Sequence, residues 1–235
     1  MNESVYTIRP IAHIHTDFPT KFGIPRQSGL APSLSAQIVF EPEFRLPEAV
    51  REIEGFSHLW LIWQFSACVR PGWSPTVRPP RLGGNQRAGV FATRSPFRPN
   101  FLGLSSVRLE KVEKNSPSGP ILYVSGADLM DGTPIFDIKP FIPFTDNHPD
   151  ASGGFADHVK DHLLQVIFPP QLLGKISPDI RTALLEVLAQ DPRPSYQNDP
   201  ERKYGFRFAD WEIRFQVKDT VLTVVEAFPS SISQK

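Results

Sequence analysis

Proline constrains the fold of this chain more than any other feature. The chain holds 25 prolines in 235 residues, about twice the roughly 5% found in average proteins. Because proline lacks a backbone N–H and has a fixed φ, it ends helices and is confined within sheets to strand edges and turns. The chain is therefore expected to form short β-strands joined by ordered loops, with few helices.

Short apolar runs recur through residues 1–145 with the spacing of an antiparallel barrel or a sandwich. The run at residues 58–65, HLWLIWQF, is apolar on both faces and typical of a buried strand. A short helix is expected at residues 47–53, where proline stands in the first turn. The other strands expected in this part are residues 7–15, 36–40, 103–112, 121–127 and 134–138.

The composition changes at residues 146–154, where the sequence NHPDASGG indicates a linker. Beyond it, residues 179–190 are expected to form a helix with one apolar face. Strands are expected at residues 161–168, 206–217 and 221–228. The sequence thus predicts a mainly β domain over residues 1–148 and a small α+β domain over residues 149–235.

Charge is distributed very unevenly, although 25 basic and 25 acidic side chains cancel over the whole chain. Residues 55–109 contain no Asp or Glu and seven arginines, so this segment carries +7 and the remainder carries 18 − 25 = −7. A neutral total therefore gives no argument against a polyanionic partner. The seven arginines are Arg70, Arg78, Arg81, Arg87, Arg94, Arg98 and Arg108.

Several classes of protein are excluded by composition. An apolar fraction of 40% is enough for a core and argues against wholesale disorder. The single cysteine, Cys68, excludes an intrachain disulfide and a cysteine-built zinc site. His158 and His162 have helical spacing but lack a third ligand, so no metal site is expected. With no signal peptide and no long apolar run, we expect a soluble cytoplasmic protein outside the membrane.

The motif RPPRLGGN at residues 78–85 places two arginines beside a glycine pair. Forked guanidinium groups and exposed backbone N–H groups suit an anionic ligand, although a proline-stiffened surface loop explains the motif equally well. The motif ATRSPFRPNFLG at residues 92–103 adds Arg94 and Arg98 in a similar setting. Neither motif matches the glycine patterns of ATP or NAD sites.

The motif DLMDGTP at residues 128–134 carries two carboxylates. It is either an ordinary Asp-Gly turn or a pair of acceptors for a hydroxyl, amine or cationic ligand. Asp137 and Lys139 lie just beyond it and are expected to pair with each other. The motif DPRPSY at residues 191–196 is either a rigid loop after the helix or a place where Arg193 and Tyr196 meet a nucleotide.

Taken in order, these motifs resemble the TrmO family of tRNA N6-threonylcarbamoyladenosine methyltransferases. The resemblance extends from about residue 7 to about residue 217. Its blocks are PRQ (25–27), FSHLW (56–60), PTVRPPRLGGN (75–85), GVFATRS (89–95), RPN (98–100), DLMDGTP (128–134), DIKP (137–140) and DPRP (191–194).

The resemblance implies an S-adenosylmethionine-dependent enzyme whose N-terminal domain is a single antiparallel β-barrel. It also implies a homodimer with the cofactor near the dimer interface. The implied acceptor is N6 of threonylcarbamoyladenosine next to the anticodon, in tRNA of the threonine type. The alternative is a non-catalytic barrel that binds RNA or another anion.

The resemblance also implies positions for the cofactor, and the basic segment and the 191–196 motif then predict positions for tRNA. The cofactor residues are Pro25, Arg26, Gln27, Phe65, Ser66, Arg94, Leu104, Asp128, Leu129, Met130 and Asp131. The tRNA-binding residues are Arg78, Arg81, Arg98, Arg193 and Tyr196. Ser66 departs from the bulkier polar residue of many relatives. No general base is assigned: Asp131, a group in residues 191–196 and the acceptor's own substituent remain alternatives.

Overall fold

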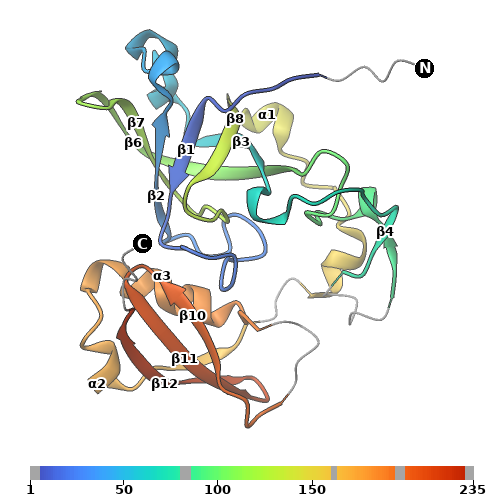
Figure 1. The fold of residues 1–235 in the computed structure, drawn as a ribbon, viewed down its shortest axis with the longest axis vertical. Coiled ribbons are helices and arrows are strands. Elements are labelled where there is room, and N and C mark those ends of the chain that lie inside the picture. The colour runs from blue at the N-terminus through green and yellow to red at the C-terminus, as the bar shows by residue number, and fades with distance from the viewer. Residues whose placement is uncertain (1–5, 80–85, 160–162, 194–198, 231–235) are drawn as a thin grey trace.

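The computed structural model describes residues 6–79, 86–159, 163–193 and 199–230, and it is mainly β, as predicted. Its N-terminal part is a closed antiparallel barrel with the strand order β1-β2-β7-β6-β3-β8 (Figure 1). The barrel strands are β1 (Ala12–His15), β2 (Ser35–Phe40), β3 (His58–Gln64), β6 (Leu102–Ser116), β7 (Gly119–Ser125) and β8 (Thr133–Pro140). Of the two architectures left open by strand spacing, the barrel is therefore confirmed.

Alternating side chains fill the barrel. On β3, Leu59, Leu61 and Trp63 point inward and are almost fully buried, as expected from the period of two in a strand. Trp60 points outward, where its ring packs 5.5 Å from that of Phe141 and its Nε1–H donates to Asp146 at 2.9 Å. This strand is therefore covered on both faces, which explains its nearly continuous apolar sequence.

The C-terminal part is a four-stranded sheet with the order β10-β11-β12-β9, in which β9 runs parallel to β12. The predicted helix is confirmed as α3, and its buried residues Ala183, Leu184, Val187 and Leu188 form the expected apolar face. The elements are α1 (Pro143–Asp146), β9 (Gln165–Ile167), α2 (Pro170–Leu173), α3 (Pro178–Ala189), β10 (Tyr204–Phe208), β11 (Trp211–Lys218) and β12 (Val221–Pro229).

The prediction of one strand over residues 206–217 was wrong. The chain turns at Ala209 and Asp210, and Ala209 has a positive φ of 47°. The buried positions change from even numbers on β10 to odd numbers on β11. This shift in the apolar alternation is the sequence signal for the turn, because a continuous strand keeps its buried side chains on one parity.

Other predicted elements differ in their bounds. The single helix predicted at residues 47–53 is replaced by two short 3-10 helices, η2 (Pro47–Val50) and η3 (Ile53–Gly55). Glu52, with φ 66°, lies between them. The strand predicted at residues 7–15 is limited to β1, and residues 160–162 of the strand predicted at 161–168 lie outside the described part.

Residues 66–101 of the arginine-rich segment form a long arm beside the barrel, at the right of Figure 1. It contains the paired strands β4 (Thr76–Val77) and β5 (Ala88–Gly89). The arm also contains the 3-10 helices η4 (Ser66–Cys68) and η6 (Val90–Ala92). Two further 3-10 helices lie elsewhere: η1 (Pro42–Phe44) follows β2, and η7 (Gly154–Val159) follows the barrel. No helix in the described ranges is both long enough and apolar enough to span a membrane.

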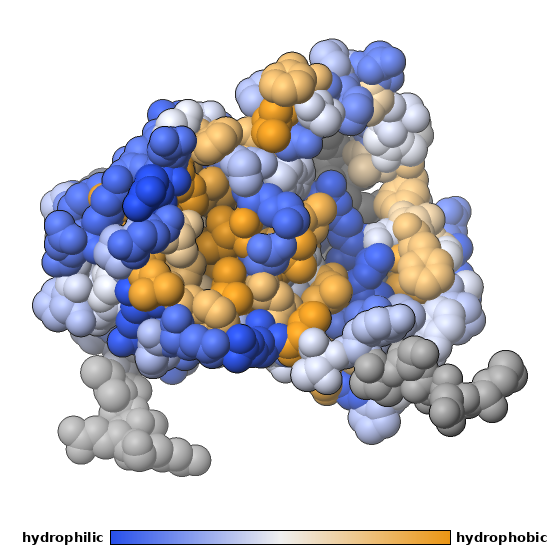
Figure 2. All heavy atoms as spheres, turned by 90° about the horizontal axis from the view of Figure 1, so that it is seen from above, coloured by the Kyte–Doolittle hydropathy of each residue, from blue (hydrophilic) through white to orange (hydrophobic). Residues whose placement is uncertain are grey.

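The loop between β1 and β2 joins the two parts of the molecule, and it runs from the lower end of the barrel in Figure 1. Phe18, Ala31 and Leu34 of this loop are buried in the core that contains α3 and the C-terminal sheet. The backbone N–H and the hydroxyl of Ser33 both donate to Glu186 of α3, at 2.8 Å. The opposite end of the barrel, seen from above in Figure 2, shows apolar side chains surrounded by hydrophilic ones.

Candidate functional site

A cavity of about 890 Å³ lies at one end of the barrel, within the size range of small-molecule sites. Four segments build it: the β1–β2 loop, the end of β3 with η4, the arm from η6 to the start of β6, and the turn between β7 and β8. Its walls therefore come from residues far apart in the sequence, held together by the barrel's strand register.

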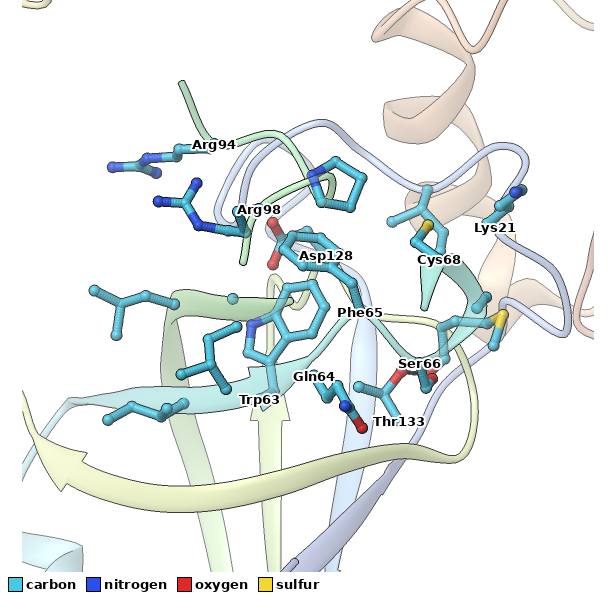
Figure 3. A pocket seen from close by; sticks show the side chains of 18 of the residues that line it. Lys21, Trp63, Gln64, Phe65, Ser66, Cys68, Arg94, Arg98, Asp128 and Thr133 are labelled. Carbon is cyan, nitrogen blue, oxygen red and sulfur yellow. Dashed lines mark hydrogen bonds between the residues drawn. The ribbon is translucent and has the colours of Figure 1, made fainter. Parts of the chain in front are cut away.

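The cavity combines cationic, aromatic and acidic groups (Figure 3). Arg94 and Arg98 lie on one side, and Trp63, Phe65 and Asp128 lie between them and the side that carries Lys21. The rings of Trp63 and Phe65 are 4.3 Å apart at their centroids and form an apolar wall. Asp128 is the only acid that the described residues contribute to the cavity wall.

Asp128 is held by hydrogen bonds and lies largely out of water. The Ser105 hydroxyl donates to its Oδ1 at 2.6 Å, and the Ser28 backbone N–H also donates to the carboxylate. Burial raises the pKa of Asp128 above its ordinary value, while the hydrogen bond from Ser105 and the charge of Arg94 act to lower it. Burial has the larger effect, so this carboxylate gains from a ligand that donates hydrogen bonds or carries positive charge.

Nine of the eleven predicted cofactor residues line this cavity. Gln27 and Arg94 come from distant segments, and the Arg94 guanidinium donates to the Gln27 side-chain oxygen across the cavity wall. The nine are Pro25, Arg26, Gln27, Phe65, Ser66, Arg94, Leu104, Asp128 and Met130. Their roles in binding stay predictions, but their convergence on one cavity is a structural fact.

Leu129 and Asp131 do not line the cavity. The Leu129 side chain is fully buried in the barrel core. Asp131 lies beside β1, where its Oδ1 is 3.2 Å from His15 Nδ1 and accepts the Thr16 backbone N–H at 3.2 Å. Asp131 therefore braces the start of the β1–β2 loop, and its predicted part in cofactor binding stays a prediction.

The arginines predicted to bind tRNA occupy different surroundings. Arg98 lines the cavity and donates to the Thr93 carbonyl at 2.9 Å, whereas Arg78 is exposed on the arm just after β4. Arg81 and Tyr196 lie outside the described residues. The arm also presents Arg87, whose Nε–H donates to the Thr76 hydroxyl at 2.8 Å.

Arg193 is bound within its own loop. Its guanidinium donates to both oxygens of Asp191, at 2.8 and 2.9 Å, and only 10% of its side chain is exposed. The hydrogen bond that Arg193 donates to Asp191 raises the pKa of Arg193. The Arg193 carbonyl accepts a hydrogen bond from Arg26 at 3.4 Å, so this C-terminal loop contacts the cavity's first segment.

Sequence reasoning missed two polar residues of the site, Trp63 and Ser105. Trp63 lines the cavity, and its Nε1–H donates to the Ser105 hydroxyl at 2.9 Å. The available signal was the position of Ser105 between Gly103 and Val107, on the inward face of a predicted strand. A polar residue at an inward position requires a partner, and here the partner belongs to the site. The predicted pairing of Asp137 with Lys139 is confirmed at 2.8 Å.

The cavity suits a small ligand that carries both signs of charge and a flat ring. Arginines can bind a carboxylate, aromatic walls can hold a ring, and Asp128 can accept from hydroxyl or ammonium groups. No group of three or more potential metal ligands occurs within the described ranges. Fold and site together define a barrel protein with a cavity of mixed charge suited to a small ligand, and no doubly wound sheet occurs among the described residues.

Comparison with known proteins gives the family. The family model described as tRNA-methyltransferase O N-terminal domain matches residues 13–147, and the TrmO C-terminal domain model matches residues 161–229. This chain belongs to the TrmO family.

Individual relatives agree over nearly the whole chain. The tRNA (adenine(37)-N6)-methyltransferase of Escherichia coli K12 is 40% identical over 234 residues, covering 96% of this chain and 99% of that protein. A Pseudomonas aeruginosa protein with the provisional name S-adenosylmethionine-dependent methyltransferase RcsF is 39% identical to this chain. The match covers 89% of this chain and 92% of that protein. A crystal structure of TrmO from Pseudomonas aeruginosa superposes with a TM-score of 0.74 at 32% identity, covering 96% of this chain and all of that one.

Proposed function

We propose that this protein methylates N6 of adenosine 37 in tRNA with S-adenosylmethionine as methyl donor, and that its acceptor is the threonylcarbamoylated form of that adenosine. The observation that carries the proposal is the convergence of nine family-implied residues on one cavity of mixed charge. Names of relatives with near-complete coverage support both the tRNA and the cofactor.

The cavity residues fit the chemistry of the proposed cofactor. S-adenosylmethionine carries a carboxylate, an ammonium, ribose hydroxyls and an adenine ring. Arg94 offers bidentate donors for the carboxylate, and the paired rings of Trp63 and Phe65 offer an apolar surface for the adenine. Asp128 offers acceptors for the ammonium or the ribose hydroxyls. When bound, the cofactor supplies an electrophilic methyl group on its sulfonium.

The protein's own contribution is positioning, since the electrophile needs no further activation. The barrel strands anchor the cavity wall, the arm lines part of it, and Arg193 contacts the cavity's first segment through its carbonyl and Arg26. The proposal gives the arm and Arg193 the contacts with the acceptor. Formation of the N6–methyl bond breaks the methyl–sulfur bond and releases the N6 proton, and no residue is assigned as the acceptor of that proton. Asp128 already accepts the Ser105 hydroxyl. The proposed role of Asp128 is therefore to hold the cofactor.

The acid-free arm is the proposed contact for tRNA. Arg78 and Arg87 are exposed there, and no carboxylate within residues 55–109 competes for them. Phosphate contacts release counterions, so tRNA affinity should fall steeply with salt concentration while cofactor affinity responds weakly. Equal salt dependence for both ligands would contradict this division of the arginines.

The proposal includes a cytoplasmic homodimer. Phe91 and Leu104 both line the cavity, yet 72% and 55% of their surfaces are exposed. Such large apolar side chains at a cavity mouth suit coverage by a second copy of the chain. Sedimentation equilibrium tests the point, and a monomer at micromolar concentration would contradict it.

Methyl transfer is the decisive experiment. Protein is incubated with methyl-labelled S-adenosylmethionine and with tRNA that carries or lacks the threonylcarbamoyl group. We expect label in the modified tRNA only. Transfer to neither substrate would refute the proposed activity and favour the alternative of a non-catalytic RNA-binding barrel, and equal transfer to both would refute the finer substrate.

A matched pair of variants separates the two ligands. Arg94→Ala is expected to weaken cofactor binding about tenfold, because it removes a cation from the cavity wall. Arg87→Ala, on the same arm but outside the cavity, should preserve cofactor affinity and reduce the salt dependence of tRNA binding by about one unit of slope.

A further inference from the structure

Three polar groups form a chain that ends in the cavity. The Trp63 Nε1–H on β3 donates to Ser105 Oγ on β6 at 2.9 Å, and Ser105 Oγ donates to Asp128 Oδ1 at 2.6 Å. Trp63 is 6% exposed and Ser105 is 1% exposed, so water does not replace either hydrogen bond easily.

The direction of this chain follows from the chemistry of its members. An indole N–H is only a donor, and a serine hydroxyl has one proton and two acceptor sites. Ser105 therefore accepts a hydrogen bond from the Trp63 N–H and donates its own O–H hydrogen bond to Asp128. The hydroxyl is fixed as a donor toward the carboxylate.

Strand register builds the chain. Trp63 pairs with Gly103 across β3 and β6, and Ser105 is the next inward residue of β6. A Cβ at Gly103 would lie 2.4 Å from Trp63 Cε2, so the indole occupies the space that any other residue would fill. The two strands thus place the indole N–H against Ser105 without a flexible loop.

Asp128 keeps acceptor capacity for a ligand. An ionised carboxylate offers about four lone-pair sites, and the contacts within the protein are Ser105 Oγ, the Ser28 backbone N–H and the backbone N–H of Asp128 itself. The charged and titratable groups that face it across the cavity come from three segments. They are Lys21 and Arg26 of the β1–β2 loop, Cys68 of η4, and Arg94 and Arg98 of the arm.

We propose that Ser105, itself oriented by Trp63, is a positioning residue that holds the Asp128 carboxylate ionised and aimed at a donor group of the bound cofactor. The donor is an ammonium or a ribose hydroxyl. This inference rests on the proposed function for the identity of the ligand, and on the three side chains alone for the relay.

The proposal requires that the loss of Ser105 act through the protonation of Asp128. Burial raises the pKa of this carboxyl, and the hydrogen bond from Ser105 is the first influence that lowers it. Without the hydroxyl the pKa rises further, so the carboxylate becomes neutral at a higher pH. A neutral carboxyl is a poorer partner for a cation or a donor.

The test compares Ser105→Ala with Ser125→Ala. Ser125 is also a buried serine that donates to a carboxylate at 2.6 Å, that of Glu110, but it lies outside the cavity wall. S-adenosylmethionine affinity is measured by calorimetry between about pH 5 and about pH 9, around the range in which a raised carboxyl pKa titrates.

Ser105→Ala is expected to weaken binding about tenfold to a hundredfold near the acid end, and to move the acid limb of the profile to higher pH. Trp63→Phe keeps an aromatic ring but removes the N–H. It should also move the acid limb of the affinity profile to higher pH, by a smaller amount than Ser105→Ala. Ser125→Ala should reproduce the wild-type profile. A Ser105→Ala profile parallel to wild type, or an equal loss in Ser125→Ala, overturns the proposal.

A second readout works without cofactor. Carboxyl carbon NMR, with the Asp128 signal assigned from Asp128→Asn, follows the titration of that group in the unliganded protein. Ser105→Ala should raise its pKa, and an unchanged pKa overturns the relay. If the wild-type protein bound no S-adenosylmethionine at any pH, the proposed function would fail while this titration still decided the role of Ser105.

Discussion

The two hydrophobic cores of this molecule are closed in different ways. All buried members of the barrel core lie within residues 12–135, on the barrel strands and their connections. The C-terminal core contains residues of α3 and its sheet, but also Phe18, Ala31 and Leu34 from the loop between β1 and β2. The barrel core is therefore formed by residues of the barrel domain alone, whereas the core of the C-terminal unit also includes residues of the barrel domain.

This difference links the C-terminal unit to the cavity. The loop that supplies Phe18 and Leu34 to the C-terminal core also supplies Lys21 and residues 24–27 to the cavity wall. Ser33 and Arg26 extend the link through Glu186 and the Arg193 carbonyl. The position of one cavity wall thus depends on packing in the C-terminal core.

Truncation of Phe18 is expected to have the largest effect on the C-terminal core. Phe18 is 1% exposed, and its ring packs edge-on to Phe208 with centroids 5.4 Å apart. Phe18→Ala should lower the free energy of unfolding by about 3–5 kcal/mol, because it leaves a cavity in the C-terminal core. Urea unfolding followed by fluorescence and far-UV circular dichroism measures the loss.

Phe144→Ala is the control for that truncation. Phe144 is 92% exposed on α1, so its removal should change the free energy of unfolding by no more than about 0.5 kcal/mol. A loss below about 1 kcal/mol for Phe18→Ala would mean that the C-terminal core closes without the barrel loop.

Local sequence patterns predicted which side chains of individual strands and helices are buried in each core. Alternation of apolar residues predicted the buried face of β3, and helical periodicity predicted the buried face of α3. The family resemblance, which the arginine and carboxylate motifs carry, predicted nine of the residues that line the cavity. These features depend on neighbours in the sequence and are therefore visible in it.

The contacts that join distant segments could not be predicted in this way. Phe18 meets Phe208 and Ser105 meets Asp128 only because of strand register and loop packing. The sequence places Phe18 in the barrel domain and gives no sign that the C-terminal core needs it. The division at residue 148 remains a useful prediction about the chain, while the packing of side chains crosses it.

Adding one methyl group at Gly23 tests whether contact with the C-terminal sheet positions the β1–β2 loop. Gly23 has φ +92°, and a Cβ there would lie 2.3 Å from Cδ2 of Phe206 on β10. Gly23→Ala should cost about 2–3 kcal/mol through strain and overpacking together. It should also weaken S-adenosylmethionine binding, because Gly23 directly precedes the cavity residues 24–27.

Gly29→Ala provides the matched control in the same loop. Gly29 also has a positive φ, +78°, but nothing lies within 4 Å of the added Cβ. Its substitution should cost about 1 kcal/mol from backbone strain alone. Equal losses of stability and of cofactor affinity in the two variants would show that contact with the C-terminal sheet does not position the loop.

The smallest predicted effect concerns a repulsive contact at the same junction. Asp17 lies in the β1–β2 loop, and its backbone carbonyl accepts the Ala209 N–H of the β10–β11 turn at 2.7 Å. Burial raises the pKa of Asp17, and the nearby carboxylates of Asp210 and Asp131 raise it further. Ionised Asp17 therefore opposes the contact between the two units.

The effect of Asp17 on the free energy of unfolding should change with pH in one definite direction. Because the pKa of Asp17 is raised in the folded state, its ionisation destabilises the fold increasingly as pH rises from the unfolded pKa of about 3.9 through the folded pKa. Asp17→Asn should therefore stabilise the protein at neutral pH by less than about 1 kcal/mol, since the side chain is partly exposed and screened. The gain should disappear below about pH 4 and shrink in high salt.

Urea unfolding at several pH values tests this sign, with Asp150→Asn in the exposed connection after the barrel as the control. Asp150→Asn should leave the free energy of unfolding unchanged across the range. A destabilised Asp17→Asn variant at neutral pH would show that this carboxylate joins the two units. The stabilisation expected here would instead show that ionised Asp17 weakens the junction, at which Phe18 and the Ser33–Glu186 hydrogen bonds supply the favourable contacts.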